Sequence, residues 1–123
     1  MPHSGSHLVL LVDDDVDLRD AIADVLQGAG CEVVTAEDGG EALAKLAAVA
    51  RPCLILLDLM MPRVDGWEFL RRLSQGAWAQ DLRVLVISAH PNASEANIYP
   101  GVLGTLGKPF DVGHLLTWVE AHC

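Results

Sequence analysis

The sequence predicts one doubly wound, three-layer α/β domain in which helices cover both faces of a five-stranded parallel sheet. One observation is a set of five short runs rich in aliphatic and β-branched residues, at positions 8–12, 31–35, 53–57, 84–87 and 102–106. Three of these runs are almost entirely apolar, which is typical of strands buried on both faces of a sheet. The other observation is helical periodicity between the runs, and the length of 123 residues leaves room for one such domain.

The segment after the first run is predicted to be a helix because its large apolar residues recur at helical spacing. They stand at i, i+4, i+7 and i+8 and are Leu18, Ile22, Val25 and Leu26. Asp15 is suited to capping the start of this helix, and Gly28 or Gly30 is suited to ending it. The run at 31–35 then follows as the second strand.

Two further helices are expected before the fourth strand. Apolar residues at helical spacing over 43–50 predict the second helix, which Pro52 would end. The third helix is expected over 67–73, after the pair Asp65-Gly66. Each of these helices connects two of the predicted strands.

The connection between the fourth and fifth strands has a different character. Pro91 and Pro100 bracket only eight residues, of which just two are large and apolar. A helix in this segment is therefore predicted to be short or irregular. The last helix is expected over 112–119, with Asp111 as its cap.

Composition and charge exclude several classes of protein. Hydrophobic residues make up 51% of the chain and charged residues 20%, which suits a globular domain. Eight basic against 17 acidic residues give a net charge of −9, so we expect no direct binding to nucleic acid or to an anionic membrane. No apolar stretch approaches the roughly 20 residues that span a bilayer, and a cytoplasmic location is expected.

The cysteines and the N-terminus carry little functional signal. The three cysteines, Cys31, Cys53 and Cys123, are odd in number and have no CxxC spacing. Free thiols are therefore expected rather than a disulfide framework or a zinc site. Residues 1–7 are expected to be a flexible N-terminal segment or a remnant of an expression tag, and the folded domain is expected over 8–123.

Polar side chains follow the predicted strands at the point where each strand ends. Asp13 and Asp14 follow the first strand, Asp58 the third and Ser88 the fourth, and Lys108 lies two residues beyond the last. Because the carboxyl ends of parallel strands meet at one edge of a sheet, we expect these side chains to share one pocket. Clustered carboxylates repel one another, and an oxygen-coordinated divalent cation would balance them. Mg²⁺ is the expected ion, and Mn²⁺ could substitute for it.

Each of these residues also has a simpler interpretation. The acids that follow the first strand resemble helix-capping residues, although three consecutive acids exceed what a cap needs. Asp58 could be a solvated loop acid, Ser88 a hydroxyl bonded to nearby backbone and Lys108 an exposed lysine. The pocket is favoured because all of them fall at the same predicted edge and because the chain has only two lysines.

Four motifs, in order, resemble those of the receiver domains of two-component response regulators. They are Leu-Val-Asp-Asp-Asp at 11–15, Leu-Leu-Asp-Leu-Met-Met-Pro-Arg-Val-Asp-Gly at 56–66, Val-Ile-Ser-Ala at 86–89 and Lys-Pro-Phe at 108–110. Each is modestly specific alone, whereas all four at these separations are highly specific. The resemblance runs from about position 8 to the C-terminus and implies a (βα)5 fold with the strand order 2-1-3-4-5.

The resemblance also implies a role for each polar residue. Asp58 would be the phosphoacceptor, Ser88 would hydrogen-bond a phosphoryl oxygen, and Lys108 would pair with the carboxylate and later with the phosphoryl group. The implied Mg²⁺ ligands are Asp14 directly, Asp13 mainly through a water, Asp58 itself, and the backbone carbonyl of Met60.

The implied function is a phosphoacceptor module that takes a phosphoryl group from a histidine kinase or a histidine phosphotransfer protein and then switches a protein-binding surface. Such a module catalyses its own phosphorylation and slow dephosphorylation, and it is not an enzyme acting on other substrates. Two alternatives stay open: a phosphorylation-independent docking domain with the same fold, and a terminal receiver excised from a hybrid histidine kinase. A phosphatase with Asp58 as nucleophile is disfavoured, because Met60 cannot protonate a leaving group.

The chain departs from the family pattern near the expected site. Thr105 stands where the family usually has an aromatic residue whose rotamer reports the state of the site. Met60 and His90 stand at positions that often tune hydrolysis, and because neither is suited to orienting water, we expect slow dephosphorylation. His90 is otherwise expected to be an exposed loop histidine, and the fluorescence of Trp67 is expected to report binding of Mg²⁺ or a phosphoryl analogue.

Overall fold

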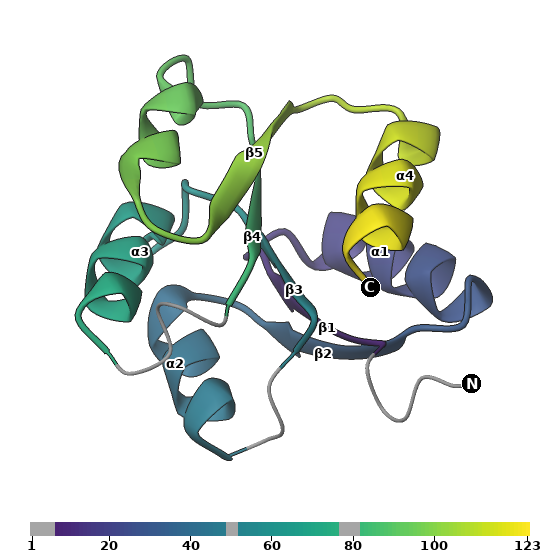
Figure 1. Cartoon of the computed structure of the whole chain (residues 1–123), viewed down its shortest axis with the longest axis horizontal. Coiled ribbons are helices and arrows are strands. Elements are labelled where there is room, and N and C mark those ends of the chain that lie inside the picture. The colour runs from purple at the N-terminus through teal and green to yellow at the C-terminus, as the bar shows by residue number, and fades with distance from the viewer. Residues whose placement is uncertain (1–6, 49–51, 77–81) are drawn as a thin grey trace.

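The computed structural model describes residues 7–48, 52–76 and 82–123, in which strands and helices alternate along the chain (Figure 1). Within these ranges five strands form one sheet with the order β2-β1-β3-β4-β5, and all neighbouring strands are parallel. The strands are β1 (Leu8–Val12), β2 (Glu32–Ala36), β3 (Leu54–Leu57), β4 (Val84–Ser88) and β5 (Val102–Gly107). The predicted fold class and strand order are confirmed.

Helices cover both faces of this sheet (Figure 1). One face is covered by α1 (Val16–Gly28) and α4 (Val112–His122). The other face is covered by α2 (Gly39–Ala48), α3 (Gly66–Ser74) and the 3₁₀ helix η1 (Ala93–Ile98). The three predicted layers are therefore present.

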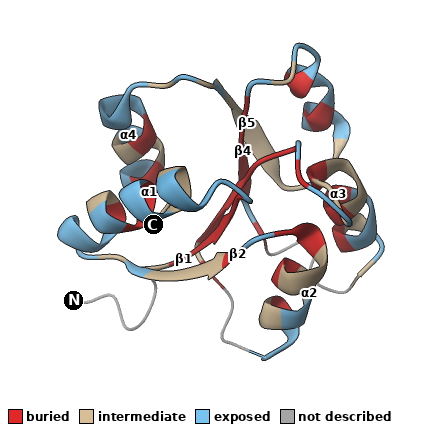
Figure 2. Ribbon diagram, turned by 180° about the vertical axis from the view of Figure 1, so that it is seen from behind, coloured by how far each residue is buried: buried red, intermediate tan, exposed pale blue. Residues whose placement is uncertain are grey.

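The central strands are buried on both faces, and they appear as the red centre of Figure 2. In β1, Val9 and Leu11 join the core beneath α1 and α4, whereas Leu10 and Val12 join the core beneath α2, α3 and η1. This two-sided burial explains why the central strands have continuous apolar sequences. The edge strand β2 is mostly half-buried, in keeping with its more mixed sequence.

The helices begin where the capping residues predict. Side-chain oxygens accept hydrogen bonds from first-turn N–H groups at the starts of α1, α3 and α4, and the caps are Asp15, Asp65 and Asp111. The second helix begins at Gly39, earlier than the predicted position 43, because the carboxylate of Asp38 accepts a hydrogen bond from the N–H of Glu41. Its predicted end at position 50 lies outside the described residues.

The connection between β4 and β5 contains the predicted short helix. It is the six-residue 3₁₀ helix η1, in which only Ala93 and Ala96 are buried. Its N-cap, Asn92, makes no side-chain hydrogen bond, and Ile98 is 82% exposed. Short length is common in 3₁₀ helices because their hydrogen-bond geometry is poorer than that of α-helices.

The expectation of free thiols is wrong for two of the cysteines. Cys53 and Cys123 form a disulfide, with their Cα atoms 5.5 Å apart. They are separated by 70 residues, and the fold brings them together because α4 runs back toward the amino end of β3. Pairing over this distance leaves no local spacing pattern in the sequence. Cys31 is a free thiol.

The N-terminal prediction falls mostly on residues 1–6, which lie outside the described residues. Among the residues that are described, none of the helices has both the length and the apolar character needed to cross a bilayer.

Candidate functional site: an acidic pocket at the carboxyl edge of the sheet

Three carboxylates converge at the carboxyl ends of β1 and β3. Asp13 and Asp14 follow β1, Asp58 follows β3, and one oxygen from each lies within 4.8 Å of the others. Asp13 is fully buried, Asp58 is 4% exposed, and Asp14 is exposed to solvent. The structure thus brings together the three acids that the sequence placed at this edge.

Backbone hydrogen bonds hold two of these acids in place. The N–H of Asp13 donates to the carbonyl of Ala36 at 3.0 Å, and the N–H of Asp58 donates to the carbonyl of Val12 at 2.9 Å. Both acids therefore continue the parallel ladder one residue beyond their strands. Their side chains also accept local N–H groups, because Asp15 donates to Asp13 Oδ1 at 2.9 Å and Met60 donates to Asp58 Oδ1 at 3.2 Å.

Lys108 places its ammonium between the two buried acids. Its Nζ lies 2.9 Å from Asp13 Oδ2 and 3.3 Å from Asp58 Oδ2. The side chain is only 19% exposed, so the simpler interpretation of Lys108 as an exposed lysine is wrong. The backbone N–H of Lys108 donates to the carbonyl of Ser88 at 3.1 Å, which fixes the lysine beside the end of β4. The predicted lysine–acid contact is present, and Asp13 is the closer partner.

Ser88 is the last residue of β4 and is 2% exposed. Its Oγ accepts a hydrogen bond from the N–H of His90 at 3.1 Å, so the simpler interpretation of a hydroxyl bonded to nearby backbone is also correct. A hydroxyl can accept one bond and still donate its own hydrogen. Ser88 therefore keeps a donor for an acceptor group.

The charges in the pocket perturb one another. Burial raises the pKa of Asp58 above its ordinary value, the Met60 N–H opposes this, the negative charge of Asp13 adds to the rise, and Lys108 opposes it. Burial alone would lower the pKa of Lys108, but hydrogen bonding and attraction from Asp13 and then Asp58 outweigh it, so that this pKa is raised. The lysine thus stays protonated.

The donor set fits a hard divalent cation. Three carboxylates face one ammonium, so negative charge is in excess, and oxygen ligands are those that Mg²⁺ prefers. The exposed position of Asp14 leaves the solvent side open for the waters that Mg²⁺ usually retains. Asp13, Asp14 and Asp58 would hold the ion, together with the Met60 carbonyl that the family resemblance implies.

The loop after Asp58 is closely packed against its own backbone. The N–H of Gly66 donates to the carbonyl of Leu59 at 3.0 Å. A Cβ at Gly66 would lie 2.5 Å from both the Asp58 carbonyl oxygen and the Leu59 Cα, so no larger residue fits without moving backbone. Gly66 therefore fixes the path of the chain after Asp58.

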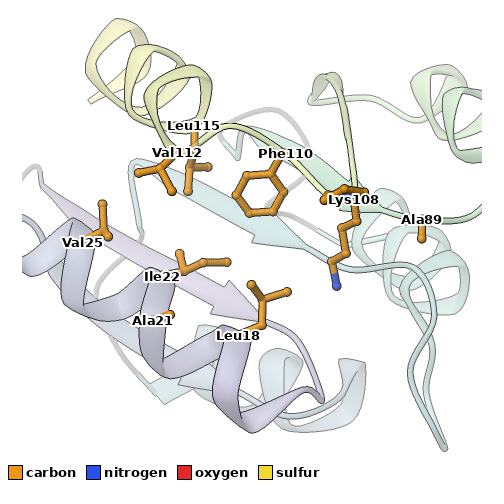
Figure 3. Close-up of a pocket in the computed structure, with 10 residues that line it drawn as sticks. Leu18, Ala21, Ile22, Val25, Ala89, Lys108, Phe110, Val112 and Leu115 are labelled. Atoms are coloured by element: carbon orange, nitrogen blue, oxygen red, sulfur yellow. The ribbon is translucent and has the colours of Figure 1, made fainter.

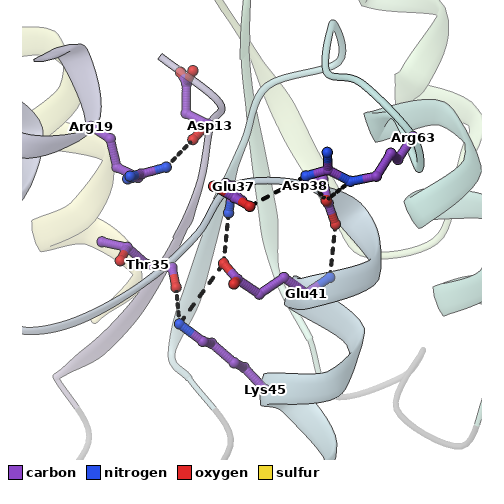
Figure 4. A network of polar contacts seen from close by, with 8 residues as sticks. All are labelled: Asp13, Arg19, Thr35, Glu37, Asp38, Glu41, Lys45 and Arg63. Atoms are coloured by element: carbon purple, nitrogen blue, oxygen red, sulfur yellow. Dashed lines mark hydrogen bonds and ion pairs between the residues drawn. The ribbon is translucent and has the colours of Figure 1, made fainter. Parts of the chain in front are cut away.

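A polar network that the sequence prediction missed connects this loop to α2 (Figure 4). Arg63 Nε donates to Asp38 Oδ2 at 2.7 Å, and its guanidinium also pairs with Glu37 at 3.3 Å. Beside it, the N–H of Gly39 donates to the Val64 carbonyl at 2.8 Å. The spacing of Asp38 and Glu41, which resembles a capping box, is the only local signal of this network in the sequence.

Two aromatic rings line a hollow next to Asp14. The rings of Trp67 and His90 meet edge to face with their centroids 5.7 Å apart, and both line a hollow of about 420 Å³ with Asp14 and Met60. His90 Nδ1 also accepts the N–H of Asn92 at 3.0 Å. His90 is half-buried and held by these contacts, so the expectation of an exposed loop histidine is wrong. The side chain of Met60 is exposed.

An apolar groove of about 480 Å³ lies beside the acidic pocket, between α1 and the start of α4 (Figure 3). Leu18 and Ile22 line it from α1, Val112 and Leu115 line it from α4, and the ring of Phe110 stands between them. The side chain of Lys108, whose Nζ pairs with the buried acids, also borders the groove. The sequence reasoning did not anticipate this groove, because its lining comes from two distant segments.

Buried acids and a lysine at the carboxyl edge of a doubly wound α/β sheet form a charged, oxygen-rich site. Sites of this class bind metal ions or phosphoryl groups. The family model of the response regulator receiver domain matches residues 9–120. The chain therefore belongs to the response regulator receiver domain family, whose members act in two-component signalling.

Sequence relatives agree with this family. The chain is 40% identical over 115 residues to the response regulator MprA of Mycolicibacterium vanbaalenii, with 92% of this chain and 48% of the relative covered. It is 39% identical over 115 residues to MprA of Mycobacterium avium, covering 92% and 49% of the two chains. The chain thus spans about half the length of the curated relatives it matches.

Solved structures agree as well. A response regulator receiver protein from Pseudomonas putida has a TM-score of 0.87 at 30% identity, covering 97% of this chain and 99% of its own. The receiver domain of NtrX from Brucella abortus has a TM-score of 0.81 at 34% identity, with coverages of 93% and 96%. TrrA from Thermotoga maritima, solved in complex with Mg²⁺-BeF, has a TM-score of 0.78 at 26% identity, with coverages of 94% and 98%.

Proposed function

We propose that the chain accepts a phosphoryl group on Asp58 from a phosphohistidine of a histidine kinase or phosphotransfer protein, with Mg²⁺ bound in the acidic pocket. The observation that carries this proposal is the contact of one lysine with two buried acids, Asp13 and Asp58, next to a third acid that faces solvent. The Mg²⁺-BeF complex of TrrA, a structural relative, supports the choice of ion and of a phosphoryl-like ligand.

Each residue of the site has its own role in phosphoryl transfer. A carboxylate oxygen of Asp58 forms a bond to phosphorus while the phosphorus–nitrogen bond of the donor breaks and its electron pair stays on the imidazole. Lys108, already 3.3 Å from Asp58, offsets charge on the transferred group, and bound Mg²⁺ would supply further charge neutralisation. Ser88 offers its remaining hydroxyl hydrogen to a phosphoryl oxygen. None of these steps requires a separate general base.

A phosphodonor protein can dock on a surface of this chain that lies next to Asp58. The apolar groove between α1 and α4 shares Lys108 with the acidic pocket, so a partner seated in it would lie beside Asp58. The outer side of α1 carries the exposed acids Asp17, Asp20 and Asp24, which favour a partner surface with positive charge. These features support a protein donor in addition to small phosphodonors.

A phosphorylation-independent docking domain is the second candidate. It is favoured by Thr105, which occupies the aromatic position of the family, and by the loosely held helix η1. Thr105 Oγ1 reaches Asn97 Oδ1 only at 3.5 Å, so the connection between β5 and η1 through these side chains is weak. In this candidate the acidic pocket would bind Mg²⁺ without passing a signal to the surface.

The decisive experiment is phosphorylation of the full chain with acetyl phosphate and Mg²⁺, followed by intact-mass measurement. One phosphoryl adduct is expected, and it should be absent in Asp58→Asn and without Mg²⁺. Asp24→Asn, which removes an exposed acid on α1, is the matched control and should still be labelled. An unlabelled parent protein, or a labelled Asp58→Asn, would reject the proposal.

Dephosphorylation is expected to be slow because the exposed Met60 side chain offers no group to position water. Met60→Asn should shorten the lifetime of the aspartyl phosphate by about tenfold or more, in line with the usual contribution of a water-positioning group. The lifetime is measured by intact mass after removal of the phosphodonor. A longer lifetime in the variant would contradict the role assigned to this position.

A further inference from the structure

We propose that Cys53 and Cys123 form a redox-modification site, at which two thiols are oxidised to a disulfide by a small disulfide such as oxidised glutathione. The site lies at the amino edge of the sheet, away from the carboxyl edge that holds the acidic pocket. It does not rest on phosphoryl transfer.

The backbone holds the two cysteines at bonding distance. Their Cα atoms are 5.5 Å apart, within the range of about 4.4–6.8 Å that disulfides require. The N–H of Cys53 donates to the Leu8 carbonyl at 2.8 Å, and the N–H of Cys123 donates to the Val119 carbonyl at 2.9 Å. Because β1 and α4 fix these positions, the two thiols remain neighbours after the disulfide is reduced.

The environment of the pair allows selective reaction. Both cysteines are half-buried, so a small oxidant can reach them. The third cysteine, Cys31, packs against the same core, and burial raises the pKa of its thiol. Cys31 is half-buried like the pair, but it has no disulfide partner in the structure, so the second, intramolecular step of exchange is open only to Cys53 and Cys123.

The chemistry is ordinary thiol–disulfide exchange. The thiolate of one cysteine attacks a sulfur of oxidised glutathione, which forms a mixed disulfide and releases one glutathione thiolate. The second cysteine, as a thiolate, then attacks the protein sulfur and releases the second glutathione. Two electrons pass from the protein thiols to glutathione, and the two thiol protons go to solvent or to the released thiolates. Reduced glutathione in excess reverses both steps.

The modification acts on α4 and leaves the acidic pocket unchanged. The disulfide ties the end of α4 to the start of β3, whereas without it this part of the helix is held by packing of Val119 and of Trp118 over Gly104. The same helix lines the apolar groove through Val112 and Leu115. The redox state of the two cysteines therefore determines how firmly α4, which lines one side of the groove, is attached to the sheet. The contacts of Asp58 and Lys108 do not change.

The test begins with the full chain, first reduced and then incubated with oxidised glutathione. Remaining thiols are alkylated after denaturation and counted by intact mass and peptide mapping. Three alkylated cysteines are expected in the reduced protein and one, Cys31, after oxidation. The matched control Cys31→Ser should show none after oxidation. Three alkylated cysteines after oxidation, or a disulfide that contains Cys31, would overturn the assignment.

Thermal unfolding supplies a second readout. The unfolding temperature of the oxidised protein should be about 10 °C above that of the reduced protein. A difference of this size is expected for a disulfide that closes a long loop in a domain of this size. Cys123→Ser should match the reduced protein and should not respond to glutathione. Equal unfolding temperatures for the oxidised and reduced parent protein would contradict the claim that the disulfide stabilises the attachment of α4.

Labelling with acetyl phosphate separates this site from the proposed function. Equal labelling of Asp58 in the two redox states is expected, because the disulfide lies at the opposite edge of the sheet. A difference in labelling would overturn the independence of the two sites. Loss of labelling in both states would reject the proposed function and leave the redox assignment standing.

Discussion

The connection from β3 to α3 and the connection from β4 to β5 both leave the carboxyl edge of the sheet, yet they are built very differently. The first is fixed by the backbone bond from Gly66 to Leu59, by the Arg63–Asp38 pair and by the Asp65 cap of α3. The second contains a single short 3₁₀ helix whose cap makes no side-chain bond. The difference teaches that the loop after Asp58 is fixed by several backbone and side-chain bonds, whereas η1 is held by two buried alanines and has no capping side chain.

The largest effect is expected at Gly66. Gly66→Ala would force a Cβ to within 2.5 Å of two backbone atoms and should lower the free energy of unfolding by about 3 kcal/mol or more. Urea denaturation measures this loss. Gly28→Ala is the matched control, because nothing lies within 4 Å of its Cβ, and it should stay within about 1 kcal/mol of the parent. Equal losses of stability in the two variants would mean that the loop after Asp58 is not tightly packed.

A smaller loss of folding stability is expected when the loop after Asp58 no longer contacts the start of α2. Arg63→Ala leaves the buried carboxylate of Asp38 without its guanidinium partner, so it should lower the urea midpoint of unfolding, but by less than Gly66→Ala does. Chemical denaturation again reports this change. Arg72→Ala removes an exposed pair with Glu68 and should cost less than about 0.5 kcal/mol. A larger loss in Arg72→Ala would reverse the ranking of these contacts.

Acid titration should isolate the contribution of Asp38, which lies between β2 and α2 and pairs with Arg63. The N–H of Glu41 lowers the pKa of Asp38 below its ordinary value of 3.8; burial opposes this and Arg63 adds to it. Its contribution to stability is therefore complete above the unfolded pKa and is lost as the pH falls through the lower folded pKa. Asp38→Asn should show a flatter loss of stability below about pH 4 than the parent protein. Parallel curves for the two proteins would exclude this linkage.

The least perturbing test compares the two connections directly. Backbone amides of η1 should exchange with solvent hydrogen much faster than those of α3, because η1 buries only two alanines whereas α3 buries Phe69, Leu70 and Leu73. Hydrogen exchange followed by mass spectrometry or NMR gives both rates in one sample. Equal protection across 93–98 and 67–73 would remove the contrast.

Much of the fold could be predicted from the sequence because burial on two faces leaves a plain pattern. The apolar runs at β1, β3 and β4 match strands that are wholly or almost wholly buried, and the acids that follow β1 and β3 meet as the parallel arrangement requires. The paired prolines around η1 likewise anticipated its short length. These signals are local, so each can be found without knowing the tertiary structure.

The features that escaped prediction depend on contacts between distant segments. Arg63 meets Asp38 across 25 residues, and Cys53 meets Cys123 across 70. His90 gains its contact with Trp67 only when β3 and β4 lie side by side. No spacing rule connects such pairs, since their distance is set by the packing of whole elements.

The backbone bonds that place Asp13 and Asp58 one residue beyond β1 and β3 have a consequence for how the domain tolerates insertions and deletions. Adding or removing one residue within β3 would turn the later side chains of that strand to the opposite layer and would also move Asp58 away from Val12. Length changes in this strand should therefore abolish both folding and the proposed phosphorylation of Asp58. The same changes between 89 and 101 should affect one of these properties without the other.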